Sequence, residues 1–268
     1  MTVETELLEA LARMATAIEY DDPKHSYTVG GRKLPSVTGI IEQMFSKPAL
    51  VQWAASLQYE ATRGAVDEWL RSTMPGQLGS PASVQQLHKA LKATRNAPAR
   101  NKGVARDLGK EAHALIEWHS HLMLGRKLPK PKVSDEAAMI FASWQEWALE
   151  VGYRPIAVEA RVYHDTELYA GTIDAIAEFK GFGIAIADWK SGKRLYLKPH
   201  GLQLEAYARC LPGMLTSVVV RLPKEDPLEP VEAVWIPRDD KAWECFKHMR
   251  QAYEFVTAKV SKGGGSDA

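Results

Sequence analysis

The chain is poor in cysteine: among its 268 residues only Cys210 and Cys245 are of this type, and they do not form a C-x-x-C pair. Two such cysteines exclude a four-cysteine zinc or iron–sulfur site and disfavour a disulfide framework. The sequence also lacks an apolar run of about 18 residues, a secretory leader and an Arg-rich amphipathic presequence. We therefore expect a protein of a reducing, cytoplasmic compartment without a membrane span.

An excess of charge of either sign is missing as well. The chain has 34 Lys and Arg residues against 33 Asp and Glu residues, a formal net charge of +1. Any contact with nucleic acid must therefore depend on a local patch. One basic stretch, between His88 and Lys110, is opposed only by Asp107. Such a run is typical of a solvated face, and it suits phosphate binding equally well. Our nucleic-acid-binding candidates from this stretch are Arg100, Lys102, Arg106 and Lys110.

Hydrophobic periodicity predicts an N-terminal region, residues 1–103, of helices with a small β-hairpin. We expect helices at Val3–Tyr20, Gly39–Phe45 and Ala49–Arg71, the hairpin at His25–Leu34, and loops at Met74–Ser83 and Ala97–Ala99. Ser36 or Thr38 is expected to cap the helix that begins at Gly39. Hydroxyls at a helix N-terminus also suit a phosphate group, so both roles stay open.

Residues 104–260 are predicted to form a second domain of the α/β class, followed by a flexible tail at 261–268. Helices are expected at Val104–Leu124, Ser134–Val151, Pro199–Cys210 and Asp239–Lys259, and strands at Arg154–Tyr163, Leu215–Leu222 and Val231–Ile236. Between them, Tyr169–Gly192 predicts a β-hairpin that turns at Gly181–Gly183.

This hairpin carries charge in apolar surroundings. Asp174 lies in the first strand, and the second strand ends in Asp188-Trp189-Lys190. Because side chains alternate along a strand, Asp188 and Lys190 project together while Trp189 points the other way. The turn can bring Asp174 beside them. Unpaired buried charge is costly, so a divalent cation held by the two acids is the simplest explanation.

Four more polar residues interrupt the apolar pattern: His113, Glu159, Gln203 and Tyr207. Gln203 and Tyr207 lie four residues apart and share one helical face. A lone helical histidine such as His113 is typically structural, and a metal ligand is the other interpretation. Glu159 is either a second-metal or water-positioning residue or an outward-facing strand residue.

The combination of two carboxylates and a lysine suits one chemistry. Carboxylates bind Mg²⁺ or Mn²⁺, and an imidazole adds tolerance for Mn²⁺. Such a metal polarises a phosphoryl oxygen and lowers the pKa of a bound water. Lys190 can orient that water or offset charge on the phosphate. The residues therefore indicate phosphodiester hydrolysis.

In this order, the segments resemble the PD-(D/E)xK nuclease superfamily, and within it the RecB-type exonucleases. The matching motifs are Gly109-x-x-x-His113, Gly171-Thr-Ile-Asp174, Asp188-Trp-Lys190 and Gln203-Leu-Glu-Ala-Tyr207. Ile173 stands where the family name has a proline, and the four cysteines of the iron–sulfur members are missing. In addition, Leu34–Thr38 followed by Lys47-x-x-Leu50-x-x-Trp53 is similar to the N-terminal region of phage exonucleases and of the mitochondrial genome maintenance exonuclease.

The resemblance implies a restriction-endonuclease-like core, with a central mixed β-sheet flanked by helices, and an N-terminal helical elaboration. It implies that the metal ligands are His113, Asp174, Asp188 and the backbone carbonyl of Trp189. It also implies a catalytic Lys190, with Gln203 and Tyr207 supporting the site. Glu159 falls where some relatives keep an acidic residue near the metal.

We therefore expect a Mg²⁺- or Mn²⁺-dependent DNA exonuclease, without an iron–sulfur cluster, that acts on single strands or DNA ends. Its expected setting is phage or bacterial recombination, repair or replication, in the host cytoplasm if a phage encodes it. No P-loop is present, so a helicase or recombination partner would be a separate chain. The alternatives are a structure-specific endonuclease on the same core and a DNA-end-binding module with little catalysis.

Overall fold

The computed structural model describes residues 2–45, 48–192, 194–213, 215–223 and 229–258, and for residues 48–50, 53 and 100–106 it describes the backbone alone. The chain divides into two compact units. We call residues 1–45 with 111–268 the sheet unit, and residues 46–110 the helical unit.

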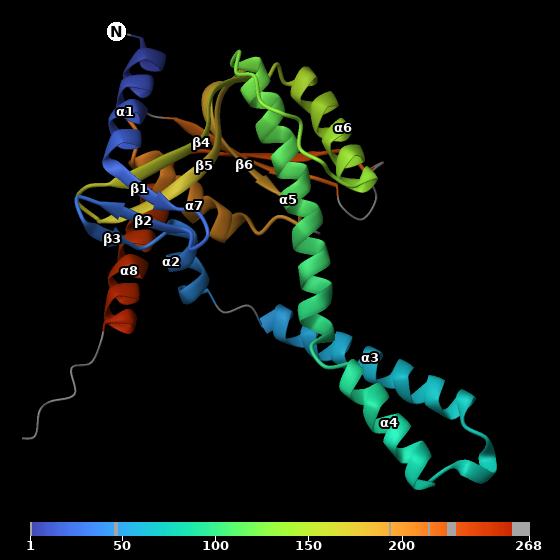
Figure 1. The fold of residues 1–268 in the computed structure, drawn as a ribbon. Helices are drawn as coiled ribbons and strands as arrows, with labels where there is room; N and C mark the ends of the chain where they lie inside the picture. The colour runs from blue at the N-terminus through green and yellow to red at the C-terminus, as the bar shows by residue number, and fades with distance from the viewer. Residues whose placement is uncertain (1, 46–47, 193, 214, 224–228, 259–268) are drawn as a thin grey trace, which may run out of the picture. The chain divides into compact units, whose positions relative to one another are not determined.

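The sheet unit is built on five strands in the order β4-β5-β6-β7-β8 (Figure 1). Their bounds are β4 Arg154–His164, β5 Tyr169–Phe179, β6 Gly183–Lys190, β7 Thr216–Arg221 and β8 Glu232–Ile236. Neighbouring strands are antiparallel except β6 and β7, which are parallel. The expected α/β class with a central mixed sheet is confirmed. The predicted β5–β6 turn is confirmed too, because Gly181 and Gly183 both adopt a positive φ there.

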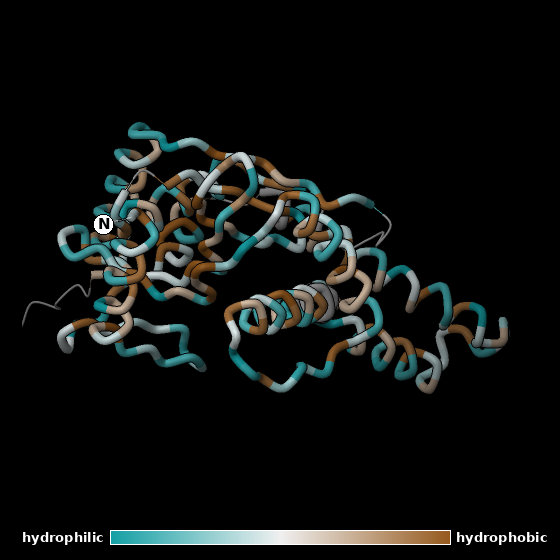
Figure 2. Tube along the Cα trace, turned by 90° about the horizontal axis from the view of Figure 1, so that it is seen from above, coloured by the Kyte–Doolittle hydropathy of each residue, from teal (hydrophilic) through white to brown (hydrophobic). Residues whose placement is uncertain are grey.

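Helices cover both faces of this sheet. On one face, α6 packs its tryptophans against β6, and the segment of α5 that belongs to the sheet unit lies beside α6. On the other face lie α1, α2, α7 and α8, which share one hydrophobic core cluster with the strands. The bounds are α1 Val3–Ala17, α2 Val37–Met44, α5 Ala97–Met123, α6 Asp135–Glu150, α7 Leu197–Arg209 and α8 Asp240–Thr257. Figure 2 shows hydrophobic residues where these elements pack together and hydrophilic residues in the loops.

A small three-stranded sheet precedes α2. It contains β1 Ile18–Asp21, β2 Ser26–Val29 and β3 Arg32–Leu34, so the predicted hairpin is confirmed and gains a strand. The helix predicted to extend to Tyr20 instead ends at Ala17. The β1 backbone pairs with β2, and Ile18 is buried by this pairing, which outweighs the helical periodicity.

The helical unit contains α3 Pro48–Ser72, the short 3₁₀ helix η1 Pro75–Gln77, α4 Pro81–Ala93 and the first turns of α5. Two loop predictions were therefore wrong. The stretch predicted as a loop at Met74–Ser83 contains η1 and the start of α4, which Ser80 caps. The loop predicted at Ala97–Ala99 is the first turn of α5, where Pro98 is tolerated because the first N–H groups of a helix have no intrahelical partner.

Residues 1–45 pack with the sheet rather than with the other helices of the predicted N-terminal region. Leu7 of α1 and Val37 and Ile40 of α2 are fully buried in the core cluster of the sheet unit. The contacts thus divide the chain differently from a single boundary at residue 103/104. Every helix in the described ranges is too short or too polar to cross a lipid bilayer.

Candidate active site

The end of β6 brings a carboxylate and an ammonium together. Asp188 and Lys190 project from the same face of the strand, as the alternation predicts. The Lys190 Nζ atom lies 2.8 Å from Asp188 Oδ1 and 2.6 Å from Oδ2. Asp188 is only 3% exposed, whereas the Lys190 side chain keeps 26% of its surface exposed, so water screens this ion pair mainly from the lysine side.

Trp189 anchors this strand end from the opposite face. Its side chain packs among Trp144, Trp147 and Tyr153, with ring centroids 5.8 to 6.1 Å away. Its backbone N–H donates a 2.8 Å hydrogen bond to Asp174 Oδ2, beyond the end of the β5–β6 ladder, while β6 stays paired with β7. Strands β5 and β6, which carry Asp174 and Asp188, therefore stop pairing at this point. The hydrogen bond fixes Asp174 beside the end of β6.

The regular alternation of β4 and β5 is interrupted at Glu159 and Asp174. These residues lie opposite each other in the register but form no ladder pair. Glu159 has a φ of 50°, which is uncommon outside glycine. Consequently Ala157 and Ala160, three residues apart, both pack against the same core cluster, although a regular strand would turn them to opposite faces. The site lies where the sheet changes its pattern.

Helix α7 packs on the sheet face from which Asp188 projects, and it holds the Asp188 carboxylate in place. Gln203 Nε2 donates to Asp188 Oδ1 at 2.9 Å and approaches the Tyr207 hydroxyl oxygen at 3.3 Å. The Tyr207 ring packs directly on Gly171 of β5: a Cβ atom at this glycine would lie 2.5 Å from Tyr207 Cε1. A side chain at position 171 would therefore clash with Tyr207, because α7 lies so close to β5. Gly171 contacts Tyr207, Tyr207 contacts Gln203, and Gln203 contacts Asp188, and we call this series the line of contacts.

The charges at the site are perturbed. Burial and the neighbouring Asp188 carboxylate raise the pKa of Asp174. Burial lowers the pKa of Lys190, but Asp188 and Asp174 outweigh it, so the net pKa is raised and the side chain is an ammonium at neutral pH. Glu159 keeps solvent exposure, yet crowding by protein atoms, with Asp174 and Glu117, raises its pKa to about 8. Acidic groups crowded in this way favour a bound cation.

The donor set fits a divalent cation with oxygen ligands. Asp188 Oδ2 is buried and accepts no hydrogen bond within the described part of the chain, although the Lys190 ammonium lies close to it. The imidazole of His113 acts on Asp174 and lowers its pKa. Mg²⁺ is commonly held by one or two carboxylates, with water and substrate phosphate completing its shell. Among the described residues, however, no three His, Cys, Asp or Glu side chains are gathered closely enough to hold a metal ion, so His113, Asp174 and Asp188 do not form a preformed metal-binding group in this structure.

Some residues near the site were not expected from the sequence. Glu117 follows His113 by one helical turn and acts on the pKa of Glu159, and their spacing of four residues was the available signal. Tyr27 of β2 meets Thr172 of β5, with their hydroxyl oxygens 2.9 Å apart. This contact joins segments 145 residues apart, and periodicity carries no information on it.

The expected nucleic-acid-binding residues are only partly described. Ser36 caps α2, because its Oγ accepts a 3.0 Å hydrogen bond from the Gly39 N–H, and Thr38 is exposed beside it. Lys110 is exposed in the helical unit. The side chains of Arg100, Lys102 and Arg106 lie outside the described residues.

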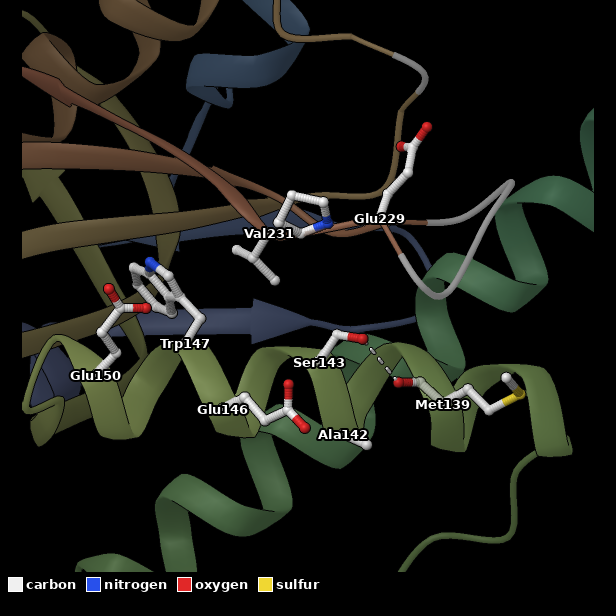
Figure 3. A pocket seen from close by; sticks show the side chains of 9 residues that line it. Met139, Ala142, Ser143, Glu146, Trp147, Glu150, Glu229 and Val231 are labelled. Carbon is white, nitrogen blue, oxygen red and sulfur yellow. Dashed lines mark hydrogen bonds between the residues drawn. The ribbon is translucent and has the colours of Figure 1, made fainter.

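A pocket of about 490 Å³ lies within the sheet unit, between α6 and residues 229–231 (Figure 3). Trp147 lines it and also contacts Trp189, so it opens on the sheet face opposite α7. Its other lining residues include Glu146, Glu150 and Glu229, whose carboxylates repel a phosphate backbone. This pocket therefore does not suit DNA.

Two carboxylates and an ammonium at the splayed end of a mixed sheet define a nuclease-type α/β core. Residues 85–214 match the PD-(D/E)XK nuclease superfamily, and this part of the chain belongs to that superfamily. Nucleases of this superfamily generally use divalent metals such as Mg²⁺, which agrees with the donor set. No curated protein matches the chain.

Proposed function

We propose that the protein is a metal-dependent DNA exonuclease of the RecB type. The observation that carries this proposal is the pair of acids Asp174 and Asp188 at the end of β6, with the buried Asp188 held by both Lys190 and Gln203. Two neighbouring carboxylates face the single Lys190 ammonium here, and such an excess of acidic groups away from water is costly unless a further cation binds. The superfamily match gives the reaction class, phosphodiester hydrolysis.

The proposed metal ligands are His113, Asp174, Asp188 and the backbone carbonyl of Trp189, and the proposed ion is Mg²⁺ or Mn²⁺. When bound, such an ion would stabilise negative charge on the phosphate and make a bound water more acidic. Glu159, with its raised pKa, is proposed to position that water or a second ion. The position of Glu159 opposite Asp174 in the β4–β5 register, and the effect of Asp174 on its pKa, support this role.

Lys190 has a role set by its protonation. Because its pKa is raised, it acts as an ammonium that donates hydrogen bonds and offsets charge on the phosphate, and not as a general base. Gln203 and Tyr207 touch no reacting atom in this proposal. They position Asp188, since the Gln203 amide donates to its carboxylate and approaches the Tyr207 hydroxyl.

The substrate class rests on the motif resemblance. We propose single strands or DNA ends as the substrate, and recombination, repair or replication in a phage or bacterium as the setting, with a helicase or recombination protein as a separate partner. Phosphate contacts are proposed for a set of hydroxyl and basic residues. They are Ser36, Thr38, Arg100, Lys102, Arg106 and Lys110.

The test is digestion of matched linear and circular single-stranded DNA, labelled at either end of the linear form. An exonuclease releases mononucleotides or short products from the linear DNA and leaves the circle intact, and the label released first reports the polarity. Rapid cutting of the circle would favour the structure-specific endonuclease instead.

A DNA-end-binding module with little catalysis is the remaining alternative. A Mn²⁺ titration by calorimetry separates it from a nuclease. Metal binding that Asp188→Asn weakens supports the nuclease. Tight binding of DNA ends without any binding of Mn²⁺ in the wild type supports the module.

A further inference from the structure

An aromatic and cationic surface borders the site on the side of the small sheet, where β1 and β2 lie against β4 and β5 (Figure 1). Tyr20 and Tyr27 are register partners in the β1–β2 pair, with ring centroids 4.9 Å apart. The guanidinium carbon of Arg161 lies 4.5 Å from the centroid of the Tyr20 ring. The Tyr20 hydroxyl oxygen is 2.9 Å from His25 Nδ1. Arg161 is therefore a planar cation placed over a ring that is itself held in position.

Arg161 lies close in sequence and in register to two acidic residues of the site, Glu159 on β4 and Asp174 on β5. It follows Glu159 by two residues on β4, and its register partner Thr172 precedes Asp174 by two residues on β5. Two residues of a regular strand span about 7 Å, so the backbone positions of Arg161 and Thr172 lie about that far along the sheet from those of Glu159 and Asp174. The Tyr27–Thr172 contact fixes the small sheet at this position.

The charge of Arg161 is available for a ligand. Its side chain is exposed, and within the described ranges it forms no ion pair or hydrogen bond. At the site its positive charge lowers the pKa of Glu159, against the larger effects of burial and of Asp174. Lys190, by contrast, already holds Asp188. A DNA strand that reaches the acids thus meets Arg161 as a cation with free donors.

We propose that Arg161, held over the Tyr20 ring, binds the backbone phosphate that neighbours the scissile one. A guanidinium presents paired N–H donors that match two phosphate oxygens, and its planar fork is preorganised, so less freedom is lost for each hydrogen bond that forms. The contact reads no base, so it anchors the strand without sequence preference. This inference rests on the proposed function, because it needs a DNA strand in the site.

The experiment measures binding of a fluorescent single-stranded DNA over a range of salt concentrations, with a chelator to prevent cleavage, and initial cleavage rates with Mg²⁺. The variants are Arg161→Gln, Arg161→Lys and Tyr20→Leu. Lys180→Gln is the matched control, since Lys180 is exposed in the β5–β6 turn, about 20 Å along the strand from Asp174.

We expect Arg161→Gln to weaken binding about 10- to 150-fold, the range of one charge-assisted hydrogen-bonded contact. The slope of log affinity against log salt should fall by about 0.7, the value for one phosphate on a single strand. The KM for cleavage should rise while kcat stays near that of the wild type. Arg161→Lys should keep the salt slope of the wild type but lose part of the affinity. Tyr20→Leu should show the same pattern as Arg161→Lys.

A DNA with a neutral methylphosphonate at one position at a time locates the contact. In the wild type, the position next to the cleavage point should weaken binding, and in Arg161→Gln the same substitution should add no further loss. An unchanged salt slope in Arg161→Gln, or an equal loss in Lys180→Gln, overturns the inference while leaving cleavage and the proposed function intact. A wild type that neither binds nor cuts DNA overturns both.

Discussion

Replacing Gly171 by alanine tests the line of contacts that holds Asp188. The added Cβ would lie 2.5 Å from Tyr207 Cε1 and 3.3 Å from Cζ and the hydroxyl oxygen. Tyr207 is 3% exposed, so its ring has no free volume to retreat into without moving its neighbours. Gly171 has no positive φ, so alanine meets no backbone strain and the effect is steric.

Overpacking of a core typically costs about 1 to 3 kcal/mol, and in a chain of this size that lowers the melting temperature by about 2 to 12 °C. Displacing Tyr207 also shifts Gln203, which donates to Asp188. We therefore expect DNA hydrolysis to fall about 10- to 100-fold at a temperature where the variant is still folded, as is typical when support for a metal ligand is lost.

Circular dichroism measures the melting temperature of each variant. Initial rates of Mg²⁺-dependent DNA hydrolysis are then measured at 20 °C, or at about 20 °C below the lower of the two melting temperatures. Gly201→Ala is the matched control, because Gly201 lies in α7 and a Cβ there would meet only Ile236 Cγ2, at 4.0 Å. This control should be neutral or stabilised, by up to about 1 kcal/mol of helix propensity. The reasoning is refuted by a Gly171→Ala variant that melts and cuts like the wild type.

Three further predictions concern other parts of the sheet unit. Gln203→Leu removes the amide donor to Asp188, so a metal titration of activity should show about 10- to 100-fold weaker half-saturation, and an unchanged titration would speak against a positioning role. Glu205→Ala should lower the free energy of unfolding, measured with denaturant, by about 3 to 5 kcal/mol, because Arg209 and Arg238 lose a partner that is 4% exposed. The control Glu244→Ala, at an exposed ion pair, should lower it by less than about 1 kcal/mol. Similar losses in the two variants would contradict this. Burial lowers the pKa of His164, so the unfolded chain takes up the proton first as the pH falls, and stability should be lost below about pH 6.5. The fall in unfolding free energy between pH 7.5 and 5.5 should be smaller in His164→Phe, and an equal fall would exclude this source.

Much of the site followed from local periodicity. The two-residue repeat placed Asp188 and Lys190 together and Trp189 opposite, and the four-residue spacing placed Gln203 and Tyr207 on one face, as the structure has them. These relations depend only on strand and helix geometry, which a sequence carries directly.

Other features depend on contacts between distant segments. The positive φ of Glu159 breaks the alternation that made it look like an ordinary strand residue. The guanidinium of Arg161 is placed by its contact with the Tyr20 ring, and Tyr20 lies 141 residues earlier in the chain. Strand β1 likewise overrides a helical pattern because β2 offers its backbone a partner. Such choices are made by tertiary packing, to which intrinsic propensity is a weak guide.

The most direct test of the central claim is hydrolysis of end-labelled DNA by the wild type, Asp188→Asn and Lys190→Met, with and without Mg²⁺ or Mn²⁺, after melting curves have shown that all three are folded. The wild type should degrade DNA only when metal is present, and each variant should be slower by about 100-fold or more, because each loses charge that acts on the reacting phosphate. Metal-dependent degradation that persists at the wild-type rate in both folded variants would contradict the assignment of the active site to Asp188 and Lys190.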